Sequence, residues 1–407
     1  MTLRTVVGLA VVLLTLAGIA LGGLPALRMN RATIALVGAT ALVVVGLVRL
    51  DEALRAIDLN TIALLFGMMV LNANLRLAGF FDLVARRLAQ RAHSPAMLLA
   101  VTVLTAGTLS AVFLNDTIVL VFTPLMLEVT RAAGLNPLPF LMAVATAANV
   151  GSTATLVGNP QNMLVGVASG ISFNRFLLHL APVAAGGLVV VIAVLWLTYH
   201  RALAPRAVQL HVPTRIRPFR PLLRKSLLAS GLLVLALLAG APVPLAALGA
   251  AGLLLVTRRV RPERVFQEID WSLLVFFAAL FVVTTAARRV GLVEAVFGWM
   301  PDAHGGGVAL AAVSTVLSNV VSNVPAVLLL QHVVVASPHP ETGWLTLAMA
   351  TTLAGNLTLL GSVANLIVAE TARREGVALS FVEYLKGGVP ITLLTLVWGV
   401  LWLGLVR

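Results

Sequence analysis

Two polar stretches within long apolar segments carry the residues best suited to bind a ligand. The first reads GSTATLVGNPQN (residues 151–162) and the second reads AGNLTLLGSVAN (residues 354–365). In a bilayer, unwound backbone persists only where protein surrounds it or where it lines a wet cavity, because its N–H and C=O groups must be hydrogen-bonded. The glycines permit unwinding, and the hydroxyl and amide side chains can replace lost hydrogen bonds or bind a ligand. The pattern therefore predicts two interrupted helices, over residues 138–168 and 343–369.

Polar residues also stand at the centres of two further apolar segments. Residues 96–131 are too long for one membrane span, which needs about 20 residues, and they read LNDT at their centre. They predict a re-entrant helical hairpin that turns at Leu114–Thr117. A second hairpin is predicted over residues 307–336, with its turn in SNVVSNVP (residues 318–325). Helix N-termini at such turns and breaks favour an anion or an oxyacid, whereas freed carbonyl groups favour a cation or a hydroxyl donor.

These four segments supply the candidate residues for binding a substrate or an ion. The candidates are Asn115, Asp116, Thr117, Gly151, Ser152, Thr153, Gly158, Asn159, Asn162, Ser322, Asn323, Gly355, Asn356, Thr358, Gly361, Ser362 and Asn365. The asparagines are expected to face the substrate or the ion. The alternative is that polar side chains in spans only hold helices together by hydrogen bonds. That alternative fits a lone residue better than this clustered and duplicated set.

Asp116 is the candidate for coupling. Of the 15 acidic residues, it alone falls inside a predicted hairpin tip or the core of an interrupted helix. A carboxylate inside a membrane is costly unless it is paired, ion-bound or protonated. Asp116 is therefore predicted to carry a proton or to bind a cation, and the alternative is a structural cap on backbone N–H groups. Asp58 and Asp270 begin spans and are predicted to be helix N-caps or partners of interfacial arginines. Arg76 and Arg288 are expected to snorkel, and the alternative for Arg288 is that it attracts anions at the outer mouth.

The composition restricts the class of protein. Hydrophobic residues make up 60% of the 407 residues and charged residues only 11%, which is typical of a polytopic membrane protein. The net charge of +13 is explained by arginines that set the membrane topology, and no nucleic-acid partner is expected. The chain has no cysteine, which excludes disulfides and thiolate metal sites. The histidines show no metal-ligand spacing. No GxxxxGK[ST] motif occurs, so we expect no cofactor apart from a coupling ion, H⁺ or Na⁺.

The apolar segments form two series in the same order. Spans are predicted near residues 5–21, 33–49, 59–78 and 176–198 and again near 226–240, 244–257, 271–287 and 389–405. Residues 56–82 align with 268–294 at a constant offset, and LSAVFLND and VGNPQNMLV align with LSNVVSNV and LGSVANLIV. With the two interrupted helices, these spans predict an all-α membrane protein of about ten transmembrane helices and two hairpins. Because each half crosses the membrane an odd number of times, the duplication predicts inverted repeats over 1–199 and 226–407.

The basic residues predict the orientation. If the N-terminus is outside, most of the 28 Lys and Arg residues fall on the inner side, as the positive-inside rule requires. The basic linker over residues 200–225 is then cytoplasmic, both termini are outside, and the protein resides in the cell (inner) membrane. The amphipathic segment FFDLVARRLAQRAH (residues 80–93) is expected to lie at the interface.

The same polar stretches resemble a known family. LNDTIVLVFTPL, ANVGSTATLVGNPQNMLVGVASGISFNRFLL and AGNLTLLGSVANLIVAETARREGVALSFVEYLKGGVP are similar to the ion transporter superfamily, closest to its arsenite-permease-like and plant silicic-acid efflux branch and related to divalent anion:sodium symporters. The resemblance implies a scaffold, a mobile transport part with both hairpins and both interrupted helices, homodimers and elevator-type alternating access. The sodium-coupled dicarboxylate carriers have Ser-Asn-Thr at both hairpin tips, whereas this chain has Leu114-Asn115-Asp116 and Ser322-Asn323-Val324.

Three classes of function are compared. The first class is a secondary transporter that exports a small inorganic oxyacid, such as arsenite, antimonite or silicic acid, in exchange for protons. Such a substrate is neutral near pH 7, which suits a predicted site core without arginine or lysine. The alternative is a sodium- or proton-coupled importer of dicarboxylate, citrate or sulfate. A channel or a membrane-bound enzyme is the third class. An enzyme is not predicted, because no histidine or second acid lies near Asp116 in the sequence.

Overall fold

The chain folds almost entirely into helices. The computed structural model describes residues 3–24, 27–204, 218–256, 260–292 and 307–406. Within these ranges the strands are the short antiparallel pair β1 (Gly23–Leu24) and β2 (Met29–Asn30). Seven of the described helices are long and apolar enough to cross a membrane. The predicted all-α membrane class is confirmed.

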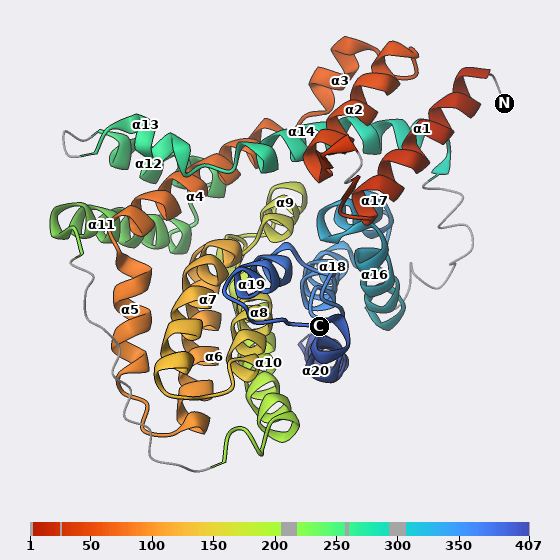
Figure 1. Ribbon diagram of the computed structural model, residues 1–407. Coiled ribbons are helices and arrows are strands. Elements are labelled where there is room, and N and C mark those ends of the chain that lie inside the picture. Colours follow the sequence, from red (N-terminus) through yellow and green to blue (C-terminus); the bar gives the residue numbers. More distant parts are fainter. Residues whose placement is uncertain (1–2, 25–26, 205–217, 257–259, 293–306, 407) are drawn as a thin grey trace.

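The helices are arranged in two layers (Figure 1). The first layer contains α1 (Leu3–Ala20), α2 (Arg31–Val44), α3 (Leu50–Ala56), α4 (Leu59–Leu77), α11 (Arg220–Leu238), α12 (Val243–Leu255), α13 (Pro262–Gln267) and α14 (Trp271–Arg289). In this layer α2 packs against α1 and α14, and α4 packs against α11 and α12. It lies across the top of Figure 1.

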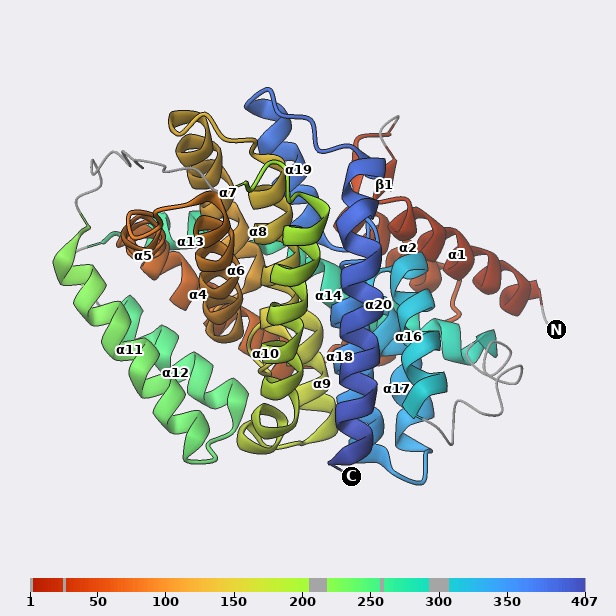
Figure 2. The same ribbon diagram turned by 90° about the horizontal axis from the view of Figure 1, so that it is seen from below.

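The second layer lies beneath the first and holds both hairpins and both helix breaks. It contains α5 (Phe80–Ala89), α6 (Pro95–Val112), α7 (Asn115–Ala132), α8 (Leu138–Ser152), α9 (Pro160–Ser169), α10 (Phe173–Thr198), α16 (Gly307–Val321), α17 (Asn323–Val335), α18 (Pro340–Ala354), α19 (Val363–Arg374) and α20 (Phe381–Leu405). Figure 2 shows α10 and α20 running side by side, and these two helices are in contact. The duplication and the inversion of the second half stay predictions.

Hydrogen bonds at the helix ends determine where several helices begin. α6 begins after Ser94, whose Oγ accepts the Met97 N–H at 3.2 Å, and Pro95 fills its first turn. α20 begins at Phe381, earlier than the predicted span, because Ser380 caps the N–H of Glu383 at 3.1 Å. The first interrupted helix begins at Leu138 as predicted and ends at Ser169, and the second extends beyond the predicted 343–369 at both ends, from Pro340 to Arg374.

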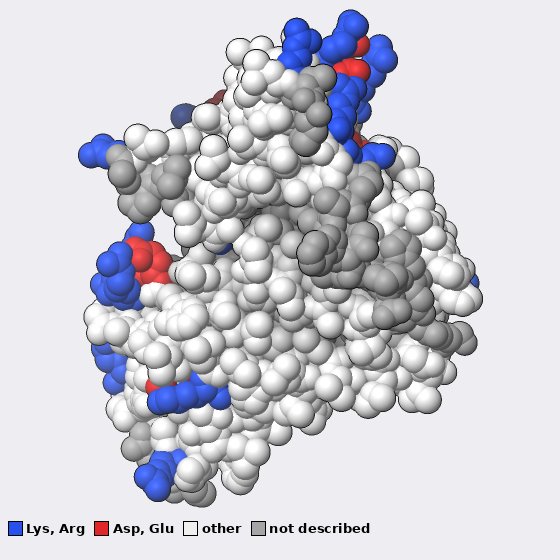
Figure 3. All heavy atoms as spheres, turned by 90° about the vertical axis from the view of Figure 1, so that its right-hand side faces the viewer, with Lys and Arg blue, Asp and Glu red and all other residues white. Residues whose placement is uncertain are grey.

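Large apolar side chains are exposed along entire helices. On α11, for example, Leu228 is 60% exposed and Leu235 63% exposed. Figure 3 shows a face on which a broad uncharged surface separates the basic and acidic side chains at its rim. Such an extended apolar surface would drive aggregation in water and is the expected surface against lipid.

Two ion pairs fasten α4 and α14 to neighbouring segments of the first layer. Arg76, near the end of α4, pairs with Glu268, which precedes α14. Arg289, at the end of α14, donates to Glu52 of α3 at 2.7 Å and to the carbonyl of Leu47 at 2.7 Å. Arg76, which was expected to snorkel, therefore also has an ion-pair partner. Each ion pair joins a residue of the first half of the chain to one of the second half, so the pairs stabilise the packing within the first layer.

Candidate functional site

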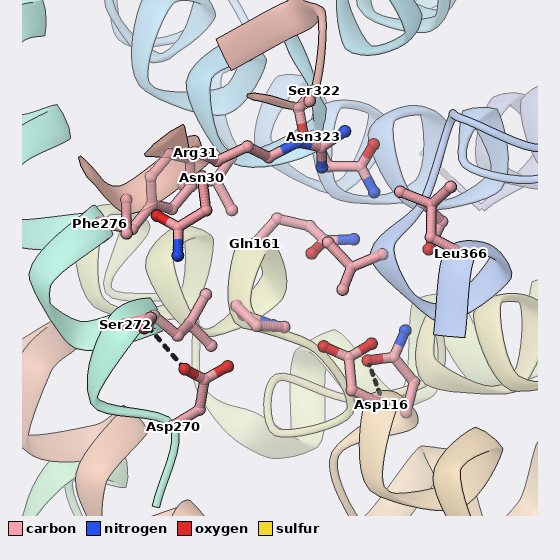
Figure 4. A pocket seen from close by; sticks show the side chains of 18 residues that line it. Asn30, Arg31, Asp116, Gln161, Asp270, Ser272, Phe276, Ser322, Asn323 and Leu366 are labelled. Carbon is pink, nitrogen blue, oxygen red and sulfur yellow. Dashed lines mark hydrogen bonds between the residues drawn. The ribbon is translucent and has the colours of Figure 1, made fainter. Parts of the chain in front are cut away.

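A cavity with a volume of about 320 Å³ lies between the two layers. From the first layer, β2, α2 and α14 contribute lining residues, and from the second layer α7, α9, α17 and α19 do so. Figure 4 shows polar side chains from both layers around this space. A smaller cavity of about 130 Å³ adjoins it, and Asp116, Pro160, Asp270, Leu273 and Val363 line both cavities.

Four helices begin at the larger cavity. The first residues of α7, α9, α17 and α19 are Asn115, Pro160, Asn323 and Val363, and all four line it. The first N–H groups of a helix lack intrahelical partners and carry the positive end of the helix dipole. The cavity is therefore suited to an anion or to the oxygen atoms of a neutral oxyacid.

The helix starts are fixed by local hydrogen bonds. The Asn159 side chain caps α9 by accepting the Asn162 N–H at 2.8 Å, and Ser362 caps α19 by accepting the Ala364 N–H at 3.2 Å. Between α16 and α17 the turn is made by Ser322, whose φ of 78° is unusual for a residue with a side chain. Backbone strain of this kind is found at functional sites in many proteins.

Among the described residues, the charged side chains that line the larger cavity are Arg31, Asp116 and Asp270. The Asp116 N–H donates to Asn115 Oδ1 at 3.0 Å. In the part of the chain that the structure describes, neither an ion pair nor a backbone N–H engages the Asp116 carboxylate. This geometry gives no support to the capping alternative for Asp116, because Asn115 supplies the hydrogen bond at this turn.

Arg31 and Asp270 change two expectations from the sequence. The four predicted segments bring no arginine or lysine, but Arg31 at the start of α2 lines the same cavity. The prediction that no second acid lies near Asp116 holds only along the sequence, because Asp270 faces the same space. Both residues lie in the first layer, far from the hairpins in sequence. Arg31 was assigned only a topological role because arginines are common at span ends.

Several predicted site residues hold the helix breaks. Asn162 Nδ2 donates to the carbonyls of Ser152 at 3.1 Å and Thr155 at 3.0 Å. In the second half, Asn365 Nδ2 donates in the same way to the carbonyls of Gly355 at 2.7 Å and Thr358 at 3.1 Å. These bonds satisfy carbonyl groups that the interrupted helices leave without partners. Both asparagines are completely buried and neither lines the larger cavity.

A further asparagine that was not predicted lies at the centre of this network. Asn149 Nδ2 donates to Asn356 Oδ1 at 2.9 Å and to Asn365 Oδ1 at 3.2 Å. Asn149 Oδ1 accepts from Asn115 Nδ2 and from Ser362 Oγ, both at 3.1 Å. Asn149 thus joins the first hairpin tip to both breaks. Its place two residues before the polar stretch GSTATLVGNPQN was the signal that could have revealed it.

The structure divides the predicted site residues into three sets. Those that line the larger cavity are Asn115, Asp116, Ser322, Asn323 and Ser362, and Thr117 lines the smaller one. Those that make buried hydrogen bonds behind it are Ser152, Thr153, Asn159, Asn162, Asn356, Thr358 and Asn365. Those that allow close backbone packing are Gly151, Gly158, Gly355 and Gly361. At Gly151 a Cβ atom would lie 2.1 Å from the carbonyl oxygen of Gly107, so no larger residue fits between α8 and α6.

An all-helical membrane protein with a polar cavity at two interrupted helices has the architecture of a secondary transporter. The sequence profile of the CitMHS family, described as citrate transporter, matches residues 9–354, and the chain belongs to this family. It is a membrane transporter and not an enzyme. The expected membership of the ion transporter superfamily is confirmed.

Similar proteins include transporters from plants and bacteria. The silicon efflux transporter LSI3 of Oryza sativa subsp. japonica is 32% identical, over 93% of this chain and 93% of its own. An uncharacterized transporter of Mycobacterium tuberculosis is 32% identical, over 93% of this chain and 94% of its own. The fold is similar to that of the YdaH transporter of Alcanivorax borkumensis, with a TM-score of 0.58 and 18% identity over 99% of this chain and 98% of that one.

Proposed function

We propose that the protein is a secondary active transporter for a small inorganic oxyacid of the arsenite, antimonite or silicic acid type. The observation that carries this proposal is the cavity at which four helices begin and where charges of both signs are present. A neutral oxyacid carries hydroxyl groups that both donate and accept hydrogen bonds. It can accept from Arg31 and the helix N-termini and donate to the side-chain oxygens of Ser322 and Asn323, which line the same cavity. The similarity to a silicon efflux transporter supports the same substrate class.

The alternative substrate is a polycarboxylate, which the description of the family favours. Helix N-termini bind carboxylates well. However, citrate or a dicarboxylate would approach two carboxylates, Asp116 and Asp270, with Arg31 as the one basic side chain on the described wall of the cavity. Like charges within one small cavity are unfavourable unless a cation is bound with the substrate. The charge balance therefore favours the neutral oxyacid.

The proposed mechanism is exchange with protons by alternating access. The cavity lies between the two layers, so a movement of the second layer against the first would open it to either side in turn. Asp116, at the tip of the first hairpin, is the proposed coupling residue. We place the protein in the inner membrane, as a homodimer, with the linker over residues 200–225 in the cytoplasm.

Transport in reconstituted vesicles tests the proposed function. We expect arsenite or silicic acid to accumulate against its gradient when a pH gradient is imposed, and citrate and sulfate to remain at the level of protein-free vesicles. A parallel series with a sodium gradient at equal pH distinguishes the two coupling ions. Accumulation of citrate but not of either oxyacid would show that the polycarboxylate alternative is correct.

The orientation has its own test. Because the chain has no cysteine, single cysteines at Val212 in the linker and at Thr2 near the N-terminus can be labelled selectively; residues 205–217 lie outside the described residues. In intact cells, an impermeant maleimide should label position 2 and leave position 212 unlabelled until the cells are permeabilised. Labelling of position 212 from outside would refute the predicted topology.

A further inference from the structure

Two aspartates at equivalent positions of the repeat differ in how their carboxylates are satisfied. Asp58 and Asp270 both cap the helix that follows them, α4 and α14. Asp58 Oδ1 accepts the Asn60 N–H at 3.0 Å, and its Oδ2 accepts the hydroxyl of Thr61 at 2.6 Å. Both oxygens of Asp58 are therefore used within the protein.

Asp270 uses only one of its oxygens in this way. Its Oδ1 accepts the Leu273 N–H at 3.0 Å. In the alignment of the two halves, Leu273 occupies the position of Thr61 and brings no hydroxyl group. Among the described residues, the second oxygen of Asp270 has no hydrogen-bond donor and no basic partner. Asp270 is exposed and lines the cavity, so this oxygen is accessible to a ligand there.

The open carboxylate of Asp270 faces the cavity that Asp116 also lines. In Figure 4 both carboxylates point into this space, one from each layer. Both residues also line the smaller cavity. Two ionised carboxylates facing one small cavity repel each other unless a cation or a proton lies between them.

A third oxygen atom completes the set of acceptors. Gln161 is only 5% exposed, and its Nε2 donates to Thr352 Oγ1 at 3.2 Å. No donor from the described residues reaches its carbonyl oxygen, and the side chain points into the cavity (Figure 4). This carbonyl oxygen is therefore open to the cavity and free to accept a hydrogen bond or to bind a cation. Carboxylate and amide oxygens are the ligands that hard cations prefer.

We propose that Asp270 and Asp116 together bind the coupling cation, H⁺ or Na⁺, at the contact between the two layers, with the Gln161 carbonyl as a further ligand when the cation is Na⁺. The other charged groups nearby are Arg31, on the far side of the cavity from both carboxylates in Figure 4, and Arg76 and Glu268, which pair with each other in the smaller cavity. Arg31 remains available to the substrate.

This arrangement provides a reason for coupling and rests on the proposed function. One carboxylate belongs to each layer, so movement of the second layer separates Asp116 from Asp270. A cation held by both carboxylates is bound more tightly than a cation held by one. The movement itself therefore lowers the affinity for the cation and releases it on the opposite side.

Asp270→Asn tests the assignment, with Asp58→Asn as the matched control. Asn retains the helix cap and the shape of the side chain but removes the charge. We expect Asp270→Asn to lower gradient-driven accumulation at least about tenfold and to preserve downhill exchange. We expect Asp58→Asn to accumulate substrate as the wild type does. Wild-type accumulation by Asp270→Asn, or an equal loss in both variants, would overturn the assignment.

Leu273→Thr provides a second test without a change of charge. The new hydroxyl would occupy the open oxygen of Asp270 as Thr61 occupies that of Asp58, so the cation must compete with it. The readout is the intrinsic fluorescence of the purified protein, titrated with Na⁺ at fixed pH and with pH in the absence of Na⁺. We expect the midpoint to move several-fold toward higher cation concentration in one of the two titrations, which identifies the ion.

These measurements separate the cation site from the substrate. If the wild type accumulates no oxyacid while Asp270→Asn and Leu273→Thr both shift the cation midpoint, the proposed substrate is wrong and the cation site stands. If the wild type accumulates an oxyacid and both variants titrate and accumulate as it does, the cation site is refuted.

Discussion

Asp116→Asn should abolish uphill transport driven by a pH gradient and leave downhill exchange of substrate measurable. The substitution preserves the size and most of the hydrogen-bonding capacity of the side chain but removes its charge and its titratable proton. Asp116 stands at the start of α7, faces both cavities, and has no ion pair in the described residues. Substrate contacts from the helix N-termini, Arg31 and Ser322 remain, so binding and exchange survive while coupling is lost.

The measurement is accumulation in vesicles at matched protein content, with counterflow of labelled substrate as the second readout. Accumulation should fall at least about tenfold, while counterflow should remain within a few-fold of the wild type. Asp58→Asn, which alters a carboxylate with both oxygens already bonded, is the control for reconstitution. If Asp116→Asn accumulates substrate fully, Asp116 does not carry the coupling proton. Loss of both counterflow and accumulation would instead assign Asp116 to substrate binding.

The interrupted helices and the hairpin turns were predictable from the sequence because they depend on local chemistry. Glycines, a proline and clustered amides are tolerated inside apolar membrane segments where protein or a wet cavity surrounds the unwound backbone. The residues at which helices begin were also predictable in part. Asn159 and Ser362, for example, cap α9 and α19. Because the two halves align, the hairpin and the interrupted helix of the first half indicated where those of the second half lie.

The charge of the site was not predictable, because it is set by tertiary contacts. Arg31 and Asp270 precede spans in which a basic residue or a helix cap is ordinary, and only the packing of the first layer on the hairpin tips brings them to the cavity. For the same reason, the sequence does not show which asparagines line the cavity and which bond to the carbonyls of the helix breaks. An amide that satisfies the carbonyls of a broken helix and an amide that faces a ligand have the same residue type and similar spacing.

Asn149→Leu is expected to have the largest effect on stability. Asn149 is 2% exposed and contacts four polar side chains: Asn115, Asn356, Ser362 and Asn365. Leucine is similar in size but leaves these groups without partners inside the protein. Each buried polar group without a partner costs roughly 1–3 kcal/mol, so the total loss should be about 3 kcal/mol or more. The effect should be large because Asn149 connects the first hairpin tip to both helix breaks, which lie far apart in the sequence.

The appropriate control is Asn74→Leu. Asn74 is also completely buried, but its Nδ2 donates only to the Val70 carbonyl of its own helix at 2.8 Å, and its Oδ1 has no partner in the described residues. Because only one of its two polar atoms is hydrogen-bonded, removing this amide should change the free energy of unfolding by less than about 1 kcal/mol. Thermal unfolding in detergent should therefore show a marked fall in melting temperature for Asn149→Leu and little change for Asn74→Leu, with transport lost only in the former. Equal melting temperatures for the two variants would mean that the Asn149 network does not hold the two interrupted helices together.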